Sequence, residues 1–228
     1  MNDHPTAALL FAAGLGTRMA PLTNDRPKPL VRVAGKALLD HAMAQFSDQT
    51  IVVNAHYFCD QIEDHLRGTT ALISDERNAL LETGGGLKHA LPLLGQGPVF
   101  TMNTDAVWSG PSPVETIAAQ WDPTRMEALL LLIPKQAAVG HKGNGDFDLL
   151  PDGRIARGTG YVYSGLQIVK TDRLVAIKDK AFSMWVLWSG MLHRSAVFGA
   201  VYTGQWCDVG RPESIKIAEE MLKSSPDV

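Results

Sequence analysis

Short apolar runs alternate with amphipathic stretches along the chain. Each apolar run has the length of a buried strand, and each amphipathic stretch repeats its apolar residues at helical spacing. The pattern predicts strands at Ala7–Ala12, Ile51–Asn54, Thr70–Ser74, Pro98–Met102, Glu127–Ile133, Tyr161–Val169 and Val197–Thr203. It predicts helices at Leu38–Phe46, Asp60–Leu66, Gly86–Leu94, Ser112–Gln120, Ser183–Arg194 and Pro212–Lys223. Such alternation is typical of an α/β protein in which helices cover both faces of a largely parallel sheet.

We expect a single domain, residues 1–228, because neither an internal repeat nor a low-complexity tract divides the chain. Residues 139–160 are rich in glycine, but they also contain Phe147, Leu149, Leu150 and Ile155. These apolar side chains can pack against a core. We therefore interpret the segment as an inserted hairpin or loop rather than as a linker.

A glycine turn directly follows the first predicted strand. Gly14 and Gly16 have no Cβ atom, so backbone N–H groups beside them can point at phosphate oxygens. Thr17 adds a hydroxyl, and Arg18 adds a permanently charged, forked donor. Ligands of open α/β sheets collect at this end of the strands, which favours a phosphate-binding turn. The candidate nucleotide-binding residues here are Ala13, Gly14, Gly16, Thr17 and Arg18.

Lys28 is the second basic residue of this region, and we expect it to contact phosphate as well. The prolines on both sides restrict the backbone, which lowers the cost of ordering the ammonium. A dinucleotide-binding loop would need glycine where Met19 stands, and a Walker loop would need Ser or Thr where Ala37 stands. A simple glycine turn with solvated basic residues remains the alternative.

Three segments together resemble the amino-terminal signature of the sugar-1-phosphate nucleotidyltransferases. They are residues 12–23 (AAGLGTRMAPLT), 27–30 (PKPL) and 33–38 (VAGKAL), where Ala37 replaces the usual proline. The resemblance implies the nucleotide-diphospho-sugar transferase fold. That fold is a Rossmann-like, three-layer α/β/α arrangement with a mixed, mostly parallel central sheet. It also implies that Arg18 and Lys28 are catalytic and hold the phosphates of the reacting pair.

Residues 81–86 (LETGGG) form a second glycine cluster, directly before a predicted helix. Glycines permit close approach of a flat ligand, and Glu82 can accept hydrogen bonds from a base or a ribose. A plain turn is the alternative from the residues alone. The segment is similar to that of short family members that act on N-acetylmuramate 1-phosphate. This implies nucleotide-binding roles for Glu82, Gly84 and Gly85.

Two aspartates are candidate Mg²⁺ ligands. Asp105 follows the strand predicted to end at Met102, in a segment where the family usually has Gly rather than Thr104. Asp208 lies in WCDVG, which resembles the family segment W-x-D-(V/I)-G before the last helix. Magnesium prefers hard oxygen ligands and commonly takes one or two carboxylates. A helix or turn cap is the alternative for each aspartate.

The sugar site is expected beside these aspartates. Residues 140–147 (GHKGNGDF) resemble the G-x-x-G-x-G-D-F loop of the muramate-specific members. By this resemblance, the candidate sugar-binding residues are Asn103, Asp146, Ser164 and Gly165. The chain lacks the Glu-Lys-Pro segment that carries a phosphate-binding lysine in many relatives. Lys28, Lys142 or Arg157 could take over that contact.

Composition and charge limit the classes of partner that the protein is expected to bind. The net charge of −3 gives no basic footprint for nucleic acid, and the 45% hydrophobic content suits a compact enzyme. Two distant cysteines indicate neither a disulfide framework nor a zinc site. No apolar run approaches the roughly 20 residues of a membrane span. We therefore expect a cytoplasmic protein that binds neither nucleic acid nor membrane.

The resemblance implies a reaction of cell-wall sugar recycling. UTP and N-acetylmuramate 1-phosphate would give UDP-N-acetylmuramate and pyrophosphate, with Mg²⁺ as cofactor. The alternative within the family is a mannose-1-phosphate guanylyltransferase. An alternative of another class is a catalytically silent regulatory protein that binds a sugar nucleotide. Retention of Arg18, Lys28, Asp105 and Asp208 together argues against the silent protein.

Overall fold

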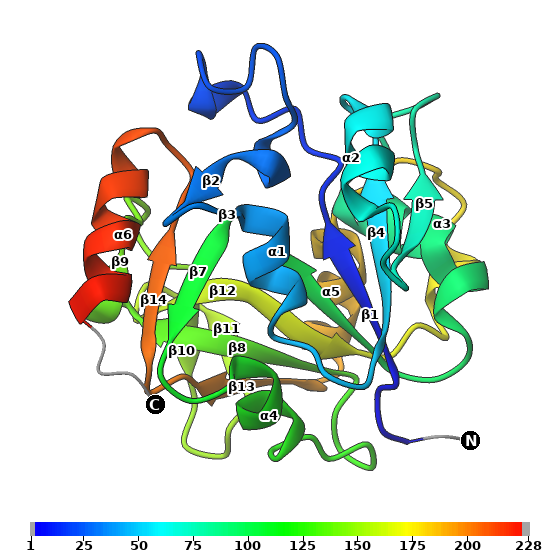
Figure 1. The fold of residues 1–228 in the computed structure, drawn as a ribbon. Helices are drawn as coiled ribbons and strands as arrows, with labels where there is room; N and C mark the ends of the chain where they lie inside the picture. Colours follow the sequence, from blue (N-terminus) through cyan, green and yellow to red (C-terminus); the bar gives the residue numbers. More distant parts are fainter. Residues whose placement is uncertain (1–2, 225–228) are drawn as a thin grey trace.

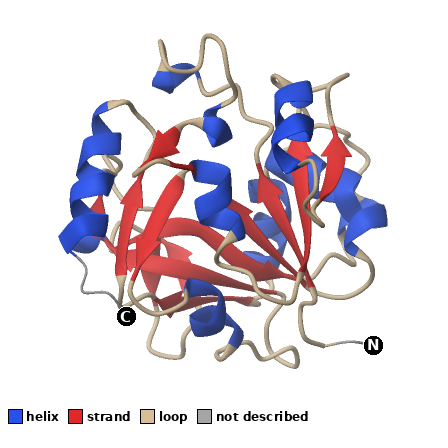
Figure 2. Cartoon of the chain, viewed as in Figure 1, coloured by secondary structure: helices blue, strands red, loops and turns tan. Residues whose placement is uncertain are grey.

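A nine-stranded sheet runs through the centre of the computed structural model, which describes residues 3–224 (Figures 1 and 2). The main path of the sheet is β11-β10-β12-β6-β1-β4-β5, and β8 joins it by pairing with β12 and with β13. The bounds are β1 Ala7–Phe11, β4 Thr50–Ala55, β5 Leu72–Asp75, β6 Val99–Asn103, β8 Ala128–Pro134, β10 Phe147–Leu149, β11 Ile155–Arg157, β12 Tyr161–Val169 and β13 Val197–Val201.

The sheet is mixed because β12 runs antiparallel to both β6 and β8. The strands β1, β4, β5 and β6 are parallel to one another, and β13 is parallel to β8. The carboxyl ends of β1, β4 and β6 therefore meet at one edge of the sheet. This is the edge at which the glycine turn after β1 was expected to bind a ligand. All seven strands predicted from the apolar runs are present.

Helices cover both faces of the sheet, as the sequence pattern predicts. Alternate residues of β1 are buried on opposite faces, with Ala8 and Leu10 in one hydrophobic cluster and Ala7 and Leu9 in another. Helices α1 (Leu38–Met43), α2 (Cys59–Leu66) and α4 (Pro113–Ala118) pack in the first cluster, and α3 (Glu82–Leu94) and α5 (Met184–His193) pack in the second. The three-layer α/β/α prediction is confirmed.

A small sheet outside these layers was not predicted. It has the order β7-β14-β9, with β7 at Ala106–Ser109, β14 at Gln205–Asp208 and β9 at Ala138–Val139. The helix α6 (Glu213–Ser224) covers it with Ala218 and Met221. The remaining short elements are β2 Arg32–Val33, β3 Lys36–Ala37, η1 Thr17–Met19, η2 Lys28–Leu30, η3 Lys135–Ala137 and η4 Leu174–Ala176. Strands this short give at most a weak alternation of apolar and polar residues, and β7, β9 and β14 also lie outside the apolar runs from which strands were predicted.

The prediction that α3 begins at Gly86, after a glycine turn, is wrong. The helix begins at Glu82, so Gly84, Gly85 and Gly86 all lie inside it. Residues 180–183 pack directly on this first turn. A Cβ at Gly85 would lie 2.2 Å from the carbonyl oxygen of Lys180, and one at Gly84 would lie 2.5 Å from the ring of Phe182. The glycines are therefore required by close packing of the chain on itself.

We propose that the described chain forms one domain, because both large hydrophobic clusters are built on the same central sheet. Within residues 3–224, no helix combines the length and the apolar character needed to cross a membrane.

Replacing Gly85 with Ala tests the packing of residues 180–183 on α3. Gly85→Ala should lower the melting temperature, because overpacking of a buried site costs about 1–3 kcal/mol. Gly190→Ala is the matched control inside α5, where the new Cβ would lie 3.4 Å from the flexible end of Arg194. It should be neutral or stabilising by about 0.5–1 kcal/mol. Thermal unfolding of both variants measures the difference, and equal melting temperatures would contradict the packing role.

Candidate active site

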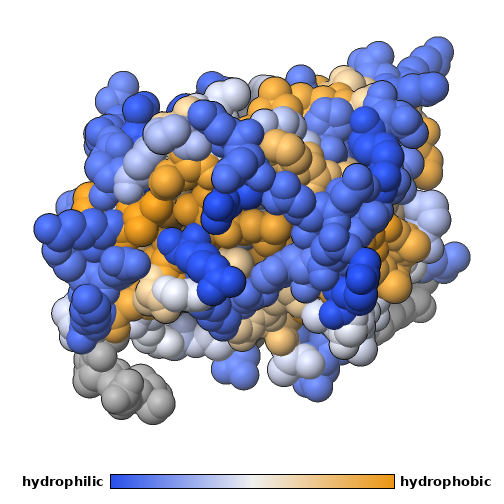
Figure 3. Space-filling view, turned by 45° about the horizontal axis from the view of Figure 1, so that its top comes forward, coloured by the Kyte–Doolittle hydropathy of each residue, from blue (hydrophilic) through white to orange (hydrophobic). Residues whose placement is uncertain are grey.

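A cavity of about 460 Å³ opens at the sheet edge where β1 and β6 end. Figure 3, in which the top of Figure 1 is turned forward, shows apolar surface bordered by polar residues on this side of the molecule. Predicted site residues that line the cavity are Gly14, Gly16, Thr17, Arg18, Lys28, Asn103 and Asp105. The structure thus brings the glycine turn, the Pro-Lys-Pro segment and the end of β6 to one place.

The glycine turn is shaped by Lys28. Gly16 adopts the left-handed conformation, with φ 63°, and a Cβ there would lie only 2.9 Å from Cβ of Lys28. Gly14 differs, because a Cβ at that position would meet no atom within 4 Å. Gly16 is needed for close packing, whereas Gly14 leaves the backbone open toward the cavity. Both glycines line the main cavity, where a bound phosphate could approach the backbone.

The two candidate metal ligands, Asp105 and Asp208, are neighbours across β7 and β14. Asp208 pairs with Ala106 in the strand register, and the N–H of Val209 donates to the carbonyl oxygen of Asp105 at 2.7 Å. Lys28 Nζ lies 2.8 Å from Asp105 Oδ2. A pairing of two short strands that was not predicted therefore places both carboxylates beside the predicted lysine.

The environment of Asp208 opposes its charge. Burial raises the pKa of this carboxyl, and the negative charge of Asp105 raises it further, while Lys28, His141 and Arg18 act in the opposite direction. Gly140 and Gly210 pack against Asp208, since a Cβ at Gly140 would lie 2.4 Å from its carbonyl oxygen. The carboxylate is thus held by close packing in a position where a cation would stabilise it.

Mg²⁺ fits this donor set. Asp105 lines the cavity, and Asp208, which pairs with Ala106, lies beside it and feels its charge. Two carboxylates offer hard oxygen atoms, which suit an ion that takes one or two protein carboxylates together with phosphate oxygens and waters. Thr104, which stands where glycine is usual, is buried and donates from Oγ1 to the carbonyl oxygen of Phe11 at 2.8 Å. Its hydroxyl ties β6 to β1 and is used within the protein.

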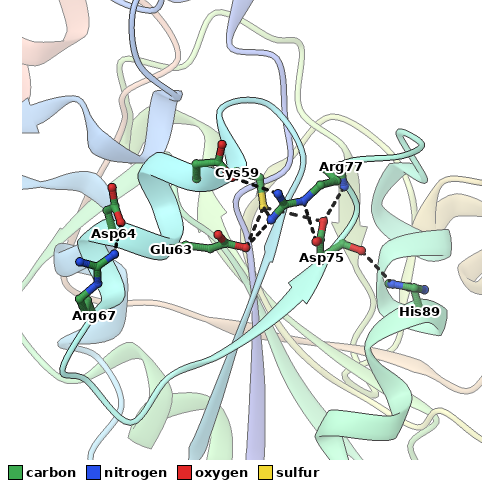
Figure 4. Close-up of polar contacts among 8 residues, drawn as sticks. Cys59, Glu63, Asp64, Arg67, Asp75, Arg77 and His89 are labelled. Atoms are coloured by element: carbon green, nitrogen blue, oxygen red, sulfur yellow. Dashed lines mark hydrogen bonds and ion pairs between the residues drawn. The ribbon is translucent and has the colours of Figure 1, made fainter.

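A second group with metal-ligand chemistry lies on α2 and at the end of β5, apart from Asp105 and Asp208 (Figure 4). Cys59, Glu63 and Asp75 could each offer one ligand atom, all within 4.8 Å of one another. The guanidinium of Arg77 already contacts all three side chains, with Nε donating to Asp75 Oδ2 at 2.7 Å. A permanent cation therefore compensates these acids, and the group is structural.

The nucleobase side differs from the prediction. Ala13, Gly14 and Glu82 line a smaller cavity of about 100 Å³ that also includes Asn54 and Glu76. Gly84 and Gly85 are buried and donate their N–H groups to the carbonyl oxygen of Phe182, both at 2.9 Å. Neither glycine lines this small cavity, and residues 180–183 pack against both. Gly85 instead lines another cavity, of about 490 Å³, together with Glu76 and Lys180, and a nucleotide-binding role for the two glycines stays a prediction.

Asn54 and Glu76 were missed by the sequence analysis. Asn54 Nδ2 donates to Glu76 Oε1 at 2.8 Å, and Asn54 Oδ1 accepts from the N–H of Ala12 at 2.7 Å. Glu76 Oε2 is buried without a hydrogen-bond partner among the described residues, and burial raises the pKa of this carboxyl. The sequence did contain one feature that could have identified these two residues, because each is a polar residue at the end of an apolar strand.

The four residues predicted to bind the sugar do not all line one cavity in the structure. Asn103 lines both the main cavity and a neighbouring cavity of about 210 Å³, and Gly165, with φ +92°, leaves room for its side chain. Ser164 is buried and accepts from the N–H of Leu166 at 3.2 Å, so its hydroxyl is used locally. Asp146 lines a third cavity, of about 250 Å³, and accepts from the N–H of Tyr163 at 2.9 Å.

Comparisons with known proteins agree with this geometry. A family model described as the MobA-like NTP transferase domain matches residues 8–143. N-acetylmuramate alpha-1-phosphate uridylyltransferase of Caulobacter vibrioides is 44% identical, over 97% of this chain and 99% of the relative. The protein of the same name from Neisseria meningitidis serogroup B is 33% identical, over 94% and 97%.

Solved structures show the same fold. The crystal structure of HddC from Yersinia pseudotuberculosis, complexed with GMP-PN, has a TM-score of 0.75 and 22% identity. The match covers 95% of this chain and 99% of HddC. The nucleotide-diphospho-sugar transferase fold predicted from the signature is thereby confirmed.

The buried carboxyl of Glu76 predicts a pH-dependent gain in stability on substitution. Because its folded pKa is raised, the wild type loses stability as pH rises from the unfolded pKa through the folded one. Glu76→Gln should therefore raise the melting temperature at pH 8 and leave it unchanged at pH 4. Exposed Glu220, which is paired only with Lys216 at 3.9 Å, provides the control variant Glu220→Gln. An equal gain from Glu76→Gln at both pH values would refute the argument.

Proposed function

The chain belongs to the MobA-like NTP transferase family, and we propose that it joins UTP to N-acetylmuramate α-1-phosphate. The products are UDP-N-acetylmuramate and pyrophosphate. The observation that carries the reaction type is the meeting of Lys28, Asp105 and Asp208 beside the phosphate-binding turn. The choice of substrates rests on the two uridylyltransferases that match nearly the whole chain.

The attacking group in this reaction is the phosphate of the sugar. A phosphate monoester has a second pKa of ~6, so near neutral pH its oxygen can attack the α-phosphorus without a general base. The backbone at Gly14 and the side chains of Thr17 and Arg18 bind the departing pyrophosphate. Lys28 neutralises charge on the reacting phosphates from its position on the cavity wall. No histidine is required as a base.

Asp105 and Asp208 would hold Mg²⁺. The bound ion would bring the two phosphate groups together and neutralise their charge. The protein's own contribution is to hold the two carboxylates in one register and to keep Lys28 next to Asp105. This positioning aligns the sugar phosphate with the α-phosphorus.

The cavities assign a direction to each substrate. The base of UTP would occupy the small cavity of Asn54, Glu76 and Glu82, which opens from Gly14. The sugar would extend the other way, past Asn103, which lines the main cavity and the second one. The α-phosphorus would then lie between them, next to Lys28 and Asp105.

The proposed place of the reaction is the cytoplasm, where nucleoside triphosphates and sugar phosphates are available, in the recycling of cell-wall sugars. The proposal would be contradicted if the protein proved to be a guanylyltransferase that acts on mannose 1-phosphate. It would also be contradicted if the protein bound a sugar nucleotide without catalysing any reaction.

Substrate choice is tested by measuring pyrophosphate release from UTP, GTP, CTP and dTTP with several sugar 1-phosphates. UTP with N-acetylmuramate 1-phosphate should give the highest kcat/KM. Preference for GTP with mannose 1-phosphate would replace the proposed substrates by the family alternative. Absence of turnover with every pair, while UDP-sugars still bind, would instead indicate a regulatory protein.

Substitution of the two aspartates tests the metal site. Asp105→Asn and Asp208→Asn should each lower kcat by about 10²–10³-fold, the usual effect of losing one electrostatic group. Their combined effect should be less than additive, because both are proposed to serve one ion. Circular dichroism and melting temperature verify the fold of each variant. Near-normal turnover at saturating Mg²⁺ would remove that residue from the site.

A further inference from the structure

Three cavities follow one another from the phosphate-binding turn to the β10–β11 hairpin. The main cavity shares Phe11, Thr83 and Asn103 with the cavity of about 210 Å³. That second cavity shares Tyr163, Trp185 and Trp188 with the one of about 250 Å³. The three cavities are therefore neighbours along one line from Lys28 to the hairpin, the direction in which a substrate with its phosphate beside Lys28 would extend.

The third cavity ends at a cation on an aromatic platform. The guanidinium carbon of Arg157 lies 3.7 Å from the ring centroid of Trp185, and both residues line this cavity. Stacking on an aromatic face orients the guanidinium and leaves its N–H edge available for hydrogen bonds. Arg157 comes from the hairpin and Trp185 from α5, so these two elements together place one charged group in the third cavity. We refer to the three neighbouring cavities as the substrate channel.

Asp146, which lines the same cavity as Arg157, and Asp148 on β10 both accept hydrogen bonds from backbone N–H groups. Asp146 accepts from the N–H of Tyr163 at 2.9 Å, and Asp148 accepts from the N–H groups of Thr159 and Gly160 at 3.1 and 2.8 Å. Among the described residues, no carboxylate forms an ion pair with Arg157. By contrast, Arg154 on the same hairpin is paired with Asp152. Arg157 therefore keeps its charge available for an anionic group from outside the protein.

The apolar wall of this channel is rigid. Trp188 Nε1 donates to Gln167 Oε1 at 2.9 Å, and Gln167 Nε2 donates to Thr101 Oγ1 at 2.9 Å. The ring of Tyr163 meets Trp188 edge to face at 5.1 Å, and Trp185 meets it at 6.4 Å. Fixed aromatic faces suit the C–H surface of a sugar ring, whose hydroxyls Asn103 and Asp146 can bind at either end.

We propose that Arg157 is the specificity-determining residue for an acidic substituent on the sugar, which it binds as a carboxylate in the third cavity. The inference rests on the proposed function, because N-acetylmuramate is N-acetylglucosamine that carries a lactyl ether with one carboxylate. With the sugar phosphate beside Lys28 and the ring along Trp188, that carboxylate reaches the guanidinium of Arg157. A planar guanidinium can bind it through two parallel hydrogen bonds.

The test compares N-acetylmuramate 1-phosphate with N-acetylglucosamine 1-phosphate, which lacks only the lactyl ether. Arg157→Leu should lower kcat/KM for the muramate substrate roughly 10- to 150-fold, the range expected for hydrogen bonds to a charged group. The value for N-acetylglucosamine 1-phosphate and the KM for UTP should not change. Arg157→Lys should recover part of the loss, because it keeps the charge without the paired hydrogen bonds.

The matched control is Arg125→Leu. Arg125 also lies over an aromatic ring, 5.1 Å from the centroid of Phe198, but lines none of these cavities. Arg125→Leu should leave kcat/KM unchanged for both sugar 1-phosphates. Equal losses for the two sugars, or no loss with the muramate substrate, would overturn the role of Arg157 while leaving the proposed function intact. A wild type that does not turn over N-acetylmuramate 1-phosphate would overturn both.

Discussion

Two neighbouring carboxylates beside the main cavity, those of Asp105 and Asp208, are the constraint on which this structure depends. Asp105 and Asp208 repel each other, and burial adds to the cost of charging Asp208. Lys28, 2.8 Å from Asp105, offsets part of that cost. The rest of the arrangement serves to hold these charges: the β7–β14 register aligns them, and α6 covers the small sheet from the outside. Such a site gains stability when a cation binds it.

Glycines make the close contacts around this centre possible. Gly16 lets the phosphate-binding turn pack on Lys28, Gly140 packs on the backbone of Asp208, and Gly165 leaves space for Asn103. Each of the three has a positive φ, between 63° and 92°. A larger residue at any of them would be strained and would also push a functional side chain out of place. The same positions therefore serve both backbone geometry and chemistry.

In the proposed function, phosphate binding and sugar selectivity belong to different parts of the structure. The main cavity lies where β1 and β6 end, whereas the third cavity lies at the β10–β11 hairpin and α5. Arg157, Trp185 and Trp188 come from these later elements and surround the far end of the substrate channel. On this proposal, changes there would alter the shape and charge of the sugar pocket without disturbing the sheet edge proposed to bind phosphates.

The sequence by itself determined the main strands and helices and the position of the glycine turn, and it singled out Lys28, Asp105 and Asp208 as candidate site residues. These signals are local: periodicity spans one element, and the signature spans a few adjacent segments. Only the tertiary structure decided that Gly84 and Gly85 face residues 180–183 and that Glu76 lies beside Asn54. It also decided that Arg157 stacks on Trp185. Those contacts join residues far apart in the chain, and their partners depend on strand register and helix packing, which no local pattern records.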